Sequence, residues 1–142
     1  LLMPRCEKIF LNLTGADLFY GKIDLKLTRD FTCFFIVNHT NDREFIEKTS
    51  MDFILSGCKD FHFFGTYEPE WHLAFDLMDS MIFPNSTYET VARTSGYDSI
   101  DDFSASLREM VFARTFVPHD FYLIYDDEVL YRKTISLLGV MR

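Results

Sequence analysis

The chain has 142 residues, a net charge of −8 and a hydrophobic fraction of 48%, which includes sixteen phenylalanines. This composition is typical of one globular domain with a sizeable core, and it argues against disorder. No apolar run reaches the roughly 18 residues that a membrane span needs, and the start of the chain lacks the features of a secretory signal. We therefore predict a single cytoplasmic domain over residues 1–142.

The negative charge is concentrated in one half of the chain. Residues 60–128 hold fourteen acids against three bases, whereas residues 1–58 hold eight acids against seven bases. Nucleic acids and anionic membranes attract basic surfaces, so we expect neither as a partner. Two interpretations stay open: the acids only keep the protein soluble, or they attract a basic protein partner.

Residues that ligate metals or act as nucleophiles have no recognisable spacing. The three cysteines are far apart and form no CxxC pair, and the four histidines are equally dispersed. A zinc site needs three or four converging ligands, and a phosphate-binding loop needs a glycine-rich turn that this chain lacks. We expect no metal, no cofactor and reduced thiols, with Cys33 and His62 buried inside apolar runs.

The first part of the chain predicts three strands and one helix. Residues 8–13 and 22–27 alternate apolar and polar residues, as strands with one exposed face do. Residues 31–38 form a nearly continuous apolar run, which is typical of a strand covered on both faces. A capping box that begins at Asn41 then predicts a helix that ends at Gly57.

The rest of the chain predicts strands at residues 60–64 and 120–125, with helices between and after them. Glu68 is the expected cap of the first of these helices, and four apolar residues line one of its faces: Trp71, Phe75, Met78 and Ile82. Two further capping boxes, which begin at Ser86 and Ser99, predict two more helices.

Parallel pairing follows from this order of elements. Strands separated by helix-length segments need crossover connections, which place the strands side by side in the same direction. The expected fold is therefore of the α/β class, a single three-layer domain with a mainly parallel sheet flanked by helices. Residues 8–13 and 22–27 are expected towards a sheet edge, because their alternation implies an exposed face.

Acidic and aromatic residues gather after three of the predicted strands. In a parallel sheet the carboxyl ends of the strands meet at one edge, where α/β proteins bind their ligands. Acids at this edge also stabilise helix N-termini by about 0.3–1 kcal/mol each, so a purely structural role stays open. The candidate partner-binding residues are Asp42, Glu44, Tyr67, Glu68, Glu70, Trp71, Tyr125, Asp126, Asp127 and Glu128.

In size, charge and expected fold type, the chain resembles bacterial immunity proteins of polymorphic-toxin and contact-dependent growth inhibition systems. The resemblance is one of overall profile and is carried by no sequence motif. It implies a cytoplasmic protein that neutralises a basic toxin, such as a nuclease, whose cleft presents Lys, Arg and His to phosphate. Two other functions stay open: an adaptor or oligomeric scaffold that uses exposed aromatic residues, and a hydrolase or transferase that uses Asp126 or Asp127.

Overall fold

The computed structural model describes residues 8–12, 31–87, 91–113 and 120–138. These residues form a five-stranded parallel sheet in the order β1-β5-β2-β3-β4. The strands are β1 (Lys8–Asn12), β2 (Phe31–Ile36), β3 (Asp60–Phe64), β4 (Arg93–Tyr97) and β5 (Asp120–Tyr125).

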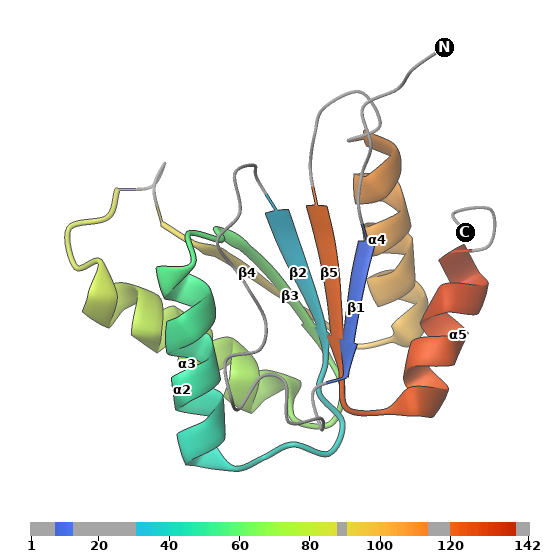
Figure 1. Ribbon diagram of the computed structural model, residues 1–142, viewed down its shortest axis with the longest axis horizontal. Helices are drawn as coiled ribbons and strands as arrows, with labels where there is room; N and C mark the ends of the chain where they lie inside the picture. Colours follow the sequence, from blue (N-terminus) through green and yellow to red (C-terminus); the bar gives the residue numbers. More distant parts are fainter. Residues whose placement is uncertain (1–7, 13–30, 88–90, 114–119, 139–142) are drawn as a thin grey trace.

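Helices cover both faces of this sheet, so the domain has three layers. The helices are α2 (Arg43–Leu55), α3 (Glu68–Ile82), α4 (Ile100–Ala113) and α5 (Glu128–Leu138). Figure 1 shows α2 and α3 on one side of the strands, and α4 and α5 on the other. The predicted α/β fold is confirmed, as are the parallel strands near residues 31–38, 60–64 and 120–125. β1 lies at one end of the strand order as expected, whereas the strand predicted at 22–27 falls outside the described residues.

The central strand β2 is covered on both faces, which explains its continuous apolar sequence. Cys33 and Phe35 belong to the core cluster under α2 and α3, whereas Phe34 and Ile36 belong to the cluster under α4 and α5. Successive side chains of a strand point to opposite faces, so one strand supplies both cores.

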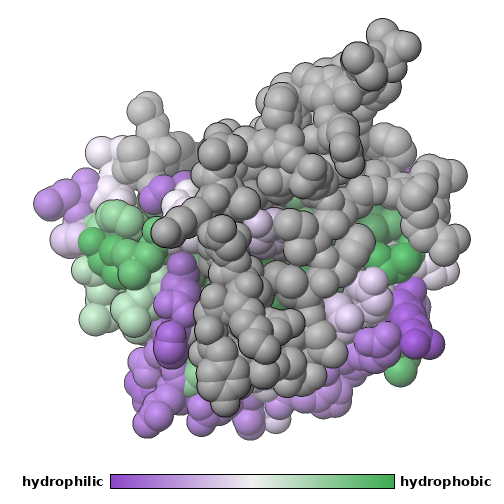
Figure 2. Space-filling model, in the orientation of Figure 1, coloured by the Kyte–Doolittle hydropathy of each residue, from purple (hydrophilic) through white to green (hydrophobic). Residues whose placement is uncertain are grey.

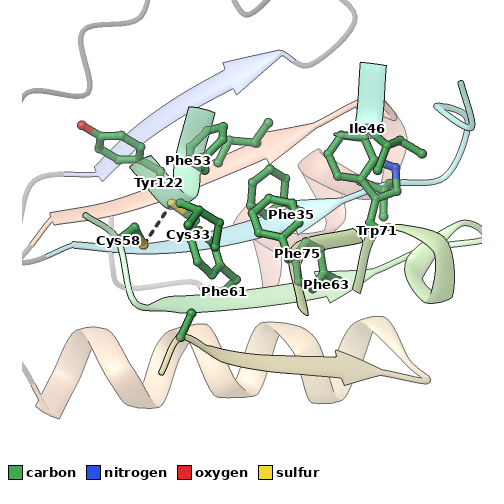
Figure 3. Packing of buried hydrophobic residues seen from close by; sticks show 14 of the residues in the cluster. Cys33, Phe35, Ile46, Phe53, Cys58, Phe61, Phe63, Trp71, Phe75 and Tyr122 are labelled. Carbon is green, nitrogen blue, oxygen red and sulfur yellow. Dashed lines mark hydrogen bonds between the residues drawn. The ribbon is translucent and has the colours of Figure 1, made fainter. Parts of the chain in front are cut away.

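Phe35 is the centre of an aromatic core beneath α2 and α3 (Figure 3). Its ring centroid lies 5.1 Å from that of Phe63 and between 5.2 and 5.7 Å from those of Phe53, Phe75 and Trp71. All five side chains are fully buried. Burial of a side chain of this kind stabilises the fold by about 1.5–3 kcal/mol, and each aromatic pair adds about 0.5–1.5 kcal/mol.

The sequence predicts only helices between the strands at 60–64 and 120–125, and this is wrong. Residues Arg93–Tyr97 form β4, which pairs in parallel with β3. Its sequence, RTSGY, lacks apolar alternation because the strand lies at the sheet edge and its side chains are partly or fully exposed. The helix predicted from Ser86 would run across residues 88–90, which lie outside the described part of the chain.

The helix caps differ from the prediction by one residue. The side chain of Asp42, not that of Asn41, caps α2, because the Asp42 carboxylate accepts a hydrogen bond of 3.0 Å from the Phe45 N–H. Glu68 is the first residue of α3 rather than its cap, and the preceding Tyr67 makes no side-chain capping bond. The predicted end of α2 is confirmed, since Gly57 follows the helix with a φ of 95°.

Two glycines with positive φ allow a test of how closely the loops after β2 and β3 pack against each other. Gly65 has a φ of 132°, and a Cβ built on it would lie 2.6 Å from the backbone of Val37, whereas a Cβ on Gly57 would meet nothing within 4 Å. We expect Gly57→Ala to cost about 1 kcal/mol, from backbone conformation alone. Gly65→Ala should cost at least about 2 kcal/mol, because the loop after β2 must also move. Urea unfolding measures both, and equal losses would contradict the close packing.

Candidate functional site

The candidate site lies where the parallel strands end. β2 and β5 are neighbours in the sheet, yet the helix after β2 covers one face and the helix after β5 covers the other. Such a reversal makes a topological switch point, the usual ligand crevice of open α/β sheets. In Figure 1 the arrowheads of both strands point to the lower edge, where α2 and α5 begin.

Asp126 lies at this switch point, where its side chain accepts hydrogen bonds from the loop after β2. Its carboxylate accepts the backbone N–H groups of Asn38 at 2.8 Å, His39 at 2.9 Å and Thr40 at 2.7 Å. The residue is only 8% exposed. A buried carboxylate that accepts three backbone donors holds the loop in place, and these bonds use three of its roughly four lone-pair positions.

Asp127 extends the same connection. It accepts hydrogen bonds from the Leu130 N–H at 3.0 Å, which caps α5, and from the Asn38 side-chain amide at 3.0 Å. Its carboxylate also lies 2.8 Å from Nε2 of His39. Burial alone raises the pKa of Asp127, but the bonds from Leu130, Asn38 and His39 outweigh burial and leave the pKa below its ordinary value.

A third loop joins this network. Asn38 Oδ1 accepts hydrogen bonds from the Thr66 N–H at 3.0 Å and the Thr66 hydroxyl at 2.6 Å. The indole N–H of Trp71 donates to the Thr40 carbonyl at 2.9 Å. Trp71 itself is fully buried and therefore presents no surface to a partner. We call the bonds made by Asp126, Asp127, Asn38 and Trp71 the edge network.

Five other candidate residues already have contacts within the chain or are partly buried: Glu68, Glu128, Tyr125, Tyr67 and Asp42. Glu68 lies 3.0 Å from Nδ1 of His72, and Glu128 lies 3.2 Å from Nε of Arg132, each one helical turn along the chain. The Tyr125 ring stacks on a ring of α5, that of Tyr131, with the centroids 4.1 Å apart. Tyr67 is half-buried, and Asp42 is exposed but caps α2.

The two remaining candidates, Glu44 and Glu70, differ from these residues. Both are exposed in the first turns of α2 and α3, and their carboxylates make no ion pair with another described residue. They are the members of the predicted set that a partner can reach directly.

The structure adds three acids that the sequence did not assign to this edge. Asp98, Asp101 and Asp102 follow β4 or open α4, and all three are exposed. The sequence predicted a helix start at Ser99 but no strand before it, so these acids had no predicted place at the sheet edge. Recognition of β4 would have found them. Figure 2 shows hydrophilic residues along the lower edge of the molecule, where the strands end.

The predicted burial of His62 and Cys33 is confirmed. His62 stacks on Phe34 and lies 2.7 Å from the Tyr97 hydroxyl, which in turn lies 2.8 Å from the hydroxyl of Ser106. Burial raises the pKa of Tyr97. The Cys33 sulfur lies 3.7 Å from that of Cys58, and burial raises the pKa of the Cys33 thiol well above its ordinary value (Figure 3).

Within the described ranges, no group of three or more His, Cys, Asp and Glu side chains is placed to hold a metal ion. None of the helices in these ranges is long and apolar enough to cross a membrane. Comparisons with protein-family models, with curated proteins and with solved structures found no match.

The edge network predicts a large stability loss for one isosteric change. Asp126→Asn places an amide N–H₂ among three backbone donors, and at least one of these partly buried donors then loses its acceptor. We expect a loss of about 3 kcal/mol or more in the free energy of unfolding. Glu128→Gln, at the exposed start of α5, should cost less than about 1 kcal/mol. Chemical denaturation compares the two, and similar losses would contradict a structural role for Asp126.

The lowered pKa of Asp127 predicts a dependence of stability on pH. The folded pKa lies below the ordinary value of 3.8, so the unfolded chain binds more protons at low pH. The stabilisation by Asp127 is complete at neutral pH, declines as the pH approaches 3.8 and is lost as the pH falls through the folded value. The difference in unfolding free energy between wild type and Asp127→Asn should therefore shrink below about pH 4. A difference that stays constant down to about pH 3 would refute the assignment.

Proposed function

We propose that this chain is a cytoplasmic binding protein that neutralises a basic protein partner through its acidic sheet edge. Within this class we propose an immunity protein that inhibits a cognate toxin, such as a nuclease. The observation that carries the proposal is a set of exposed carboxylates around the edge network that make no ion pair with other described residues. We call this set the acidic edge: Glu44, Glu70, Asp98, Asp101 and Asp102.

Internal structure accounts for only part of the charge at this edge. Asp126 and Asp127 hold the loops together, and Asp42 caps a helix. The acidic edge is different, because a first-turn acid gains only about 0.3–1 kcal/mol from the helix dipole and must bear repulsion from its neighbours. A basic partner would relieve that repulsion.

The same arrangement suits the surface of a nuclease. Enzymes that bind nucleic acids present Lys and Arg towards phosphate groups. Carboxylates spread over the starts of three helices are complementary to such a cleft, and they would speed association and disfavour acidic partners. The net charge of −8 adds a long-range attraction of the same sign.

The adaptor alternative is favoured by exposed apolar residues on α3, among them Leu73, Leu77 and Met81. A hydrolase or transferase that uses Asp126 or Asp127 is less favoured, because both carboxylates already accept several hydrogen bonds.

Charge reversal tests the acidic edge. One variant carries Glu44→Lys and Asp101→Lys, and a matched control carries Asp52→Lys and Glu109→Lys, exposed positions away from the edge with the same total change of charge. The tagged proteins are expressed in the source cell, and the captured partner is identified and then purified for stopped-flow binding. We expect capture of a basic protein by wild type and control, and association at least about tenfold slower for the edge variant at low salt.

Salt provides a second readout of the same proposal. The Debye length falls from about 30 Å at 0.01 M salt to about 8 Å at physiological ionic strength. The difference in association rate between the edge variant and the control should therefore narrow as salt is added. An acidic partner, or equal rates for the two variants at low salt, would refute the proposal.

A further inference from the structure

A groove between α2 and α3 opens beside the acidic edge. It encloses about 500 Å³. Its inner surface is formed by Ile46, which is buried, and by Ala74 and Met78, which are partly buried. Its polar end is formed by Asn41, Arg43, Glu47 and Glu70.

The outer wall of this groove is an exposed apolar stripe on α3. Leu73, Leu77 and Met81 recur every four residues and are 59%, 53% and 71% exposed. They lie on a different side of the helix from Trp71 and Phe75, which are fully buried in the core. Figure 2 shows a hydrophobic area on the left of the molecule, over α3 and the adjoining end of α2. An exposed apolar row that adjoins a groove is a candidate interaction site.

The dimensions of the stripe suit one helix of a partner. Leu73 and Met81 are eight residues apart, which corresponds to about 12 Å along a helix axis. This length is matched by about two turns of an amphipathic helix with apolar residues at i, i+3 or i+4, and i+7. Methionine side chains, here Met78 and Met81, adapt readily to the shape of an inserted side chain.

Charge selects among the possible occupants. Arg43 pairs with Glu47 at 3.6 Å, which leaves Glu70 as the acid without a basic partner at the polar end of the groove. Glu44 follows Arg43 in the first turn of α2 and belongs, with Glu70, to the acidic edge. A second copy of this chain would bring another net charge of −8 against these acids. A helix with lysine or arginine at one end would instead neutralise them.

We infer that this groove binds an amphipathic helix of the basic partner, with the apolar stripe of that helix against Leu73, Leu77 and Met81 and its basic end at Glu70. The inference rests on the proposed function, because that function supplies a basic partner. It adds to the acidic edge a surface that holds the partner by burial of apolar area.

A labelled peptide tests the groove without knowledge of the partner. The probe is a synthetic helix of about 18 residues with a leucine stripe and lysines in its first turns, and a second probe carries glutamine in place of lysine. Fluorescence anisotropy should show binding of the lysine probe to the full chain at least about tenfold tighter than that of the glutamine probe.

Three variants locate the binding. Leu77→Glu should weaken the lysine probe by about tenfold or more, whereas Val129→Glu, a change at a 75% exposed position of α5, should leave its binding unchanged. Glu70→Lys should weaken the lysine probe but not the glutamine probe. All three positions are exposed, so the variants are expected to fold.

Other outcomes separate this inference from the proposed function. Peptide binding that Leu77→Glu leaves unchanged would overturn the groove, and so would a wild-type dimer in sedimentation that Leu77→Glu dissociates. If the cellular partner is basic and sensitive to the acidic edge but indifferent to Leu77→Glu, the groove fails and the proposed function stands. If the captured partner is acidic, the proposed function fails. The inference about the groove then fails as well, because it requires a basic partner.

Discussion

The buried carboxylate of Asp126 is the interaction on which the arrangement of the sheet edge depends. The loop between β2 and α2 exposes three consecutive backbone N–H groups, at Asn38, His39 and Thr40, and one side chain from the end of β5 accepts all three. Without it these donors would lose the acceptor that they share in a partly buried loop. The loop it fixes then supplies the carbonyl that receives the Trp71 indole N–H, so the start of α3 is also set relative to β5.

The charges of this edge divide into two kinds with different physical effects. Carboxylates of the edge network are satisfied by hydrogen bonds within the chain, and their removal should change stability rather than binding. Those of the acidic edge are exposed on the first turns or approaches of helices, and their removal should change long-range attraction. A count of acids from the sequence cannot separate the two kinds, because only the folded loops decide which carboxylates find backbone donors.

The sequence predicts best where one interaction dominates. Residues 32–37 are buried, as the apolar run predicted, and Phe75 lies in the core as its helical spacing predicted. Trp71 shares that spacing but was also a candidate contact residue, and it is fully buried. β4 was missed because an edge strand needs little apolar surface, so its residues show no strand pattern. Its backbone pairing with β3, which the sequence does not reveal, holds it in the sheet. The partners of Asp126 were beyond prediction, since Asn38 is 88 residues away and donates through its backbone.

The exposed face of α3 adds to the acidic edge a surface for apolar contacts, which charged residues cannot provide. Electrostatic attraction chiefly raises the rate of encounter and disfavours wrong partners, whereas a long-lived complex needs well-packed apolar contacts from which water is excluded. Leu73, Leu77 and Met81 offer such contacts beside Glu70, where the groove meets the acidic edge. A protein that must capture a basic partner quickly and release it slowly would need both surfaces side by side, because each governs a different rate constant.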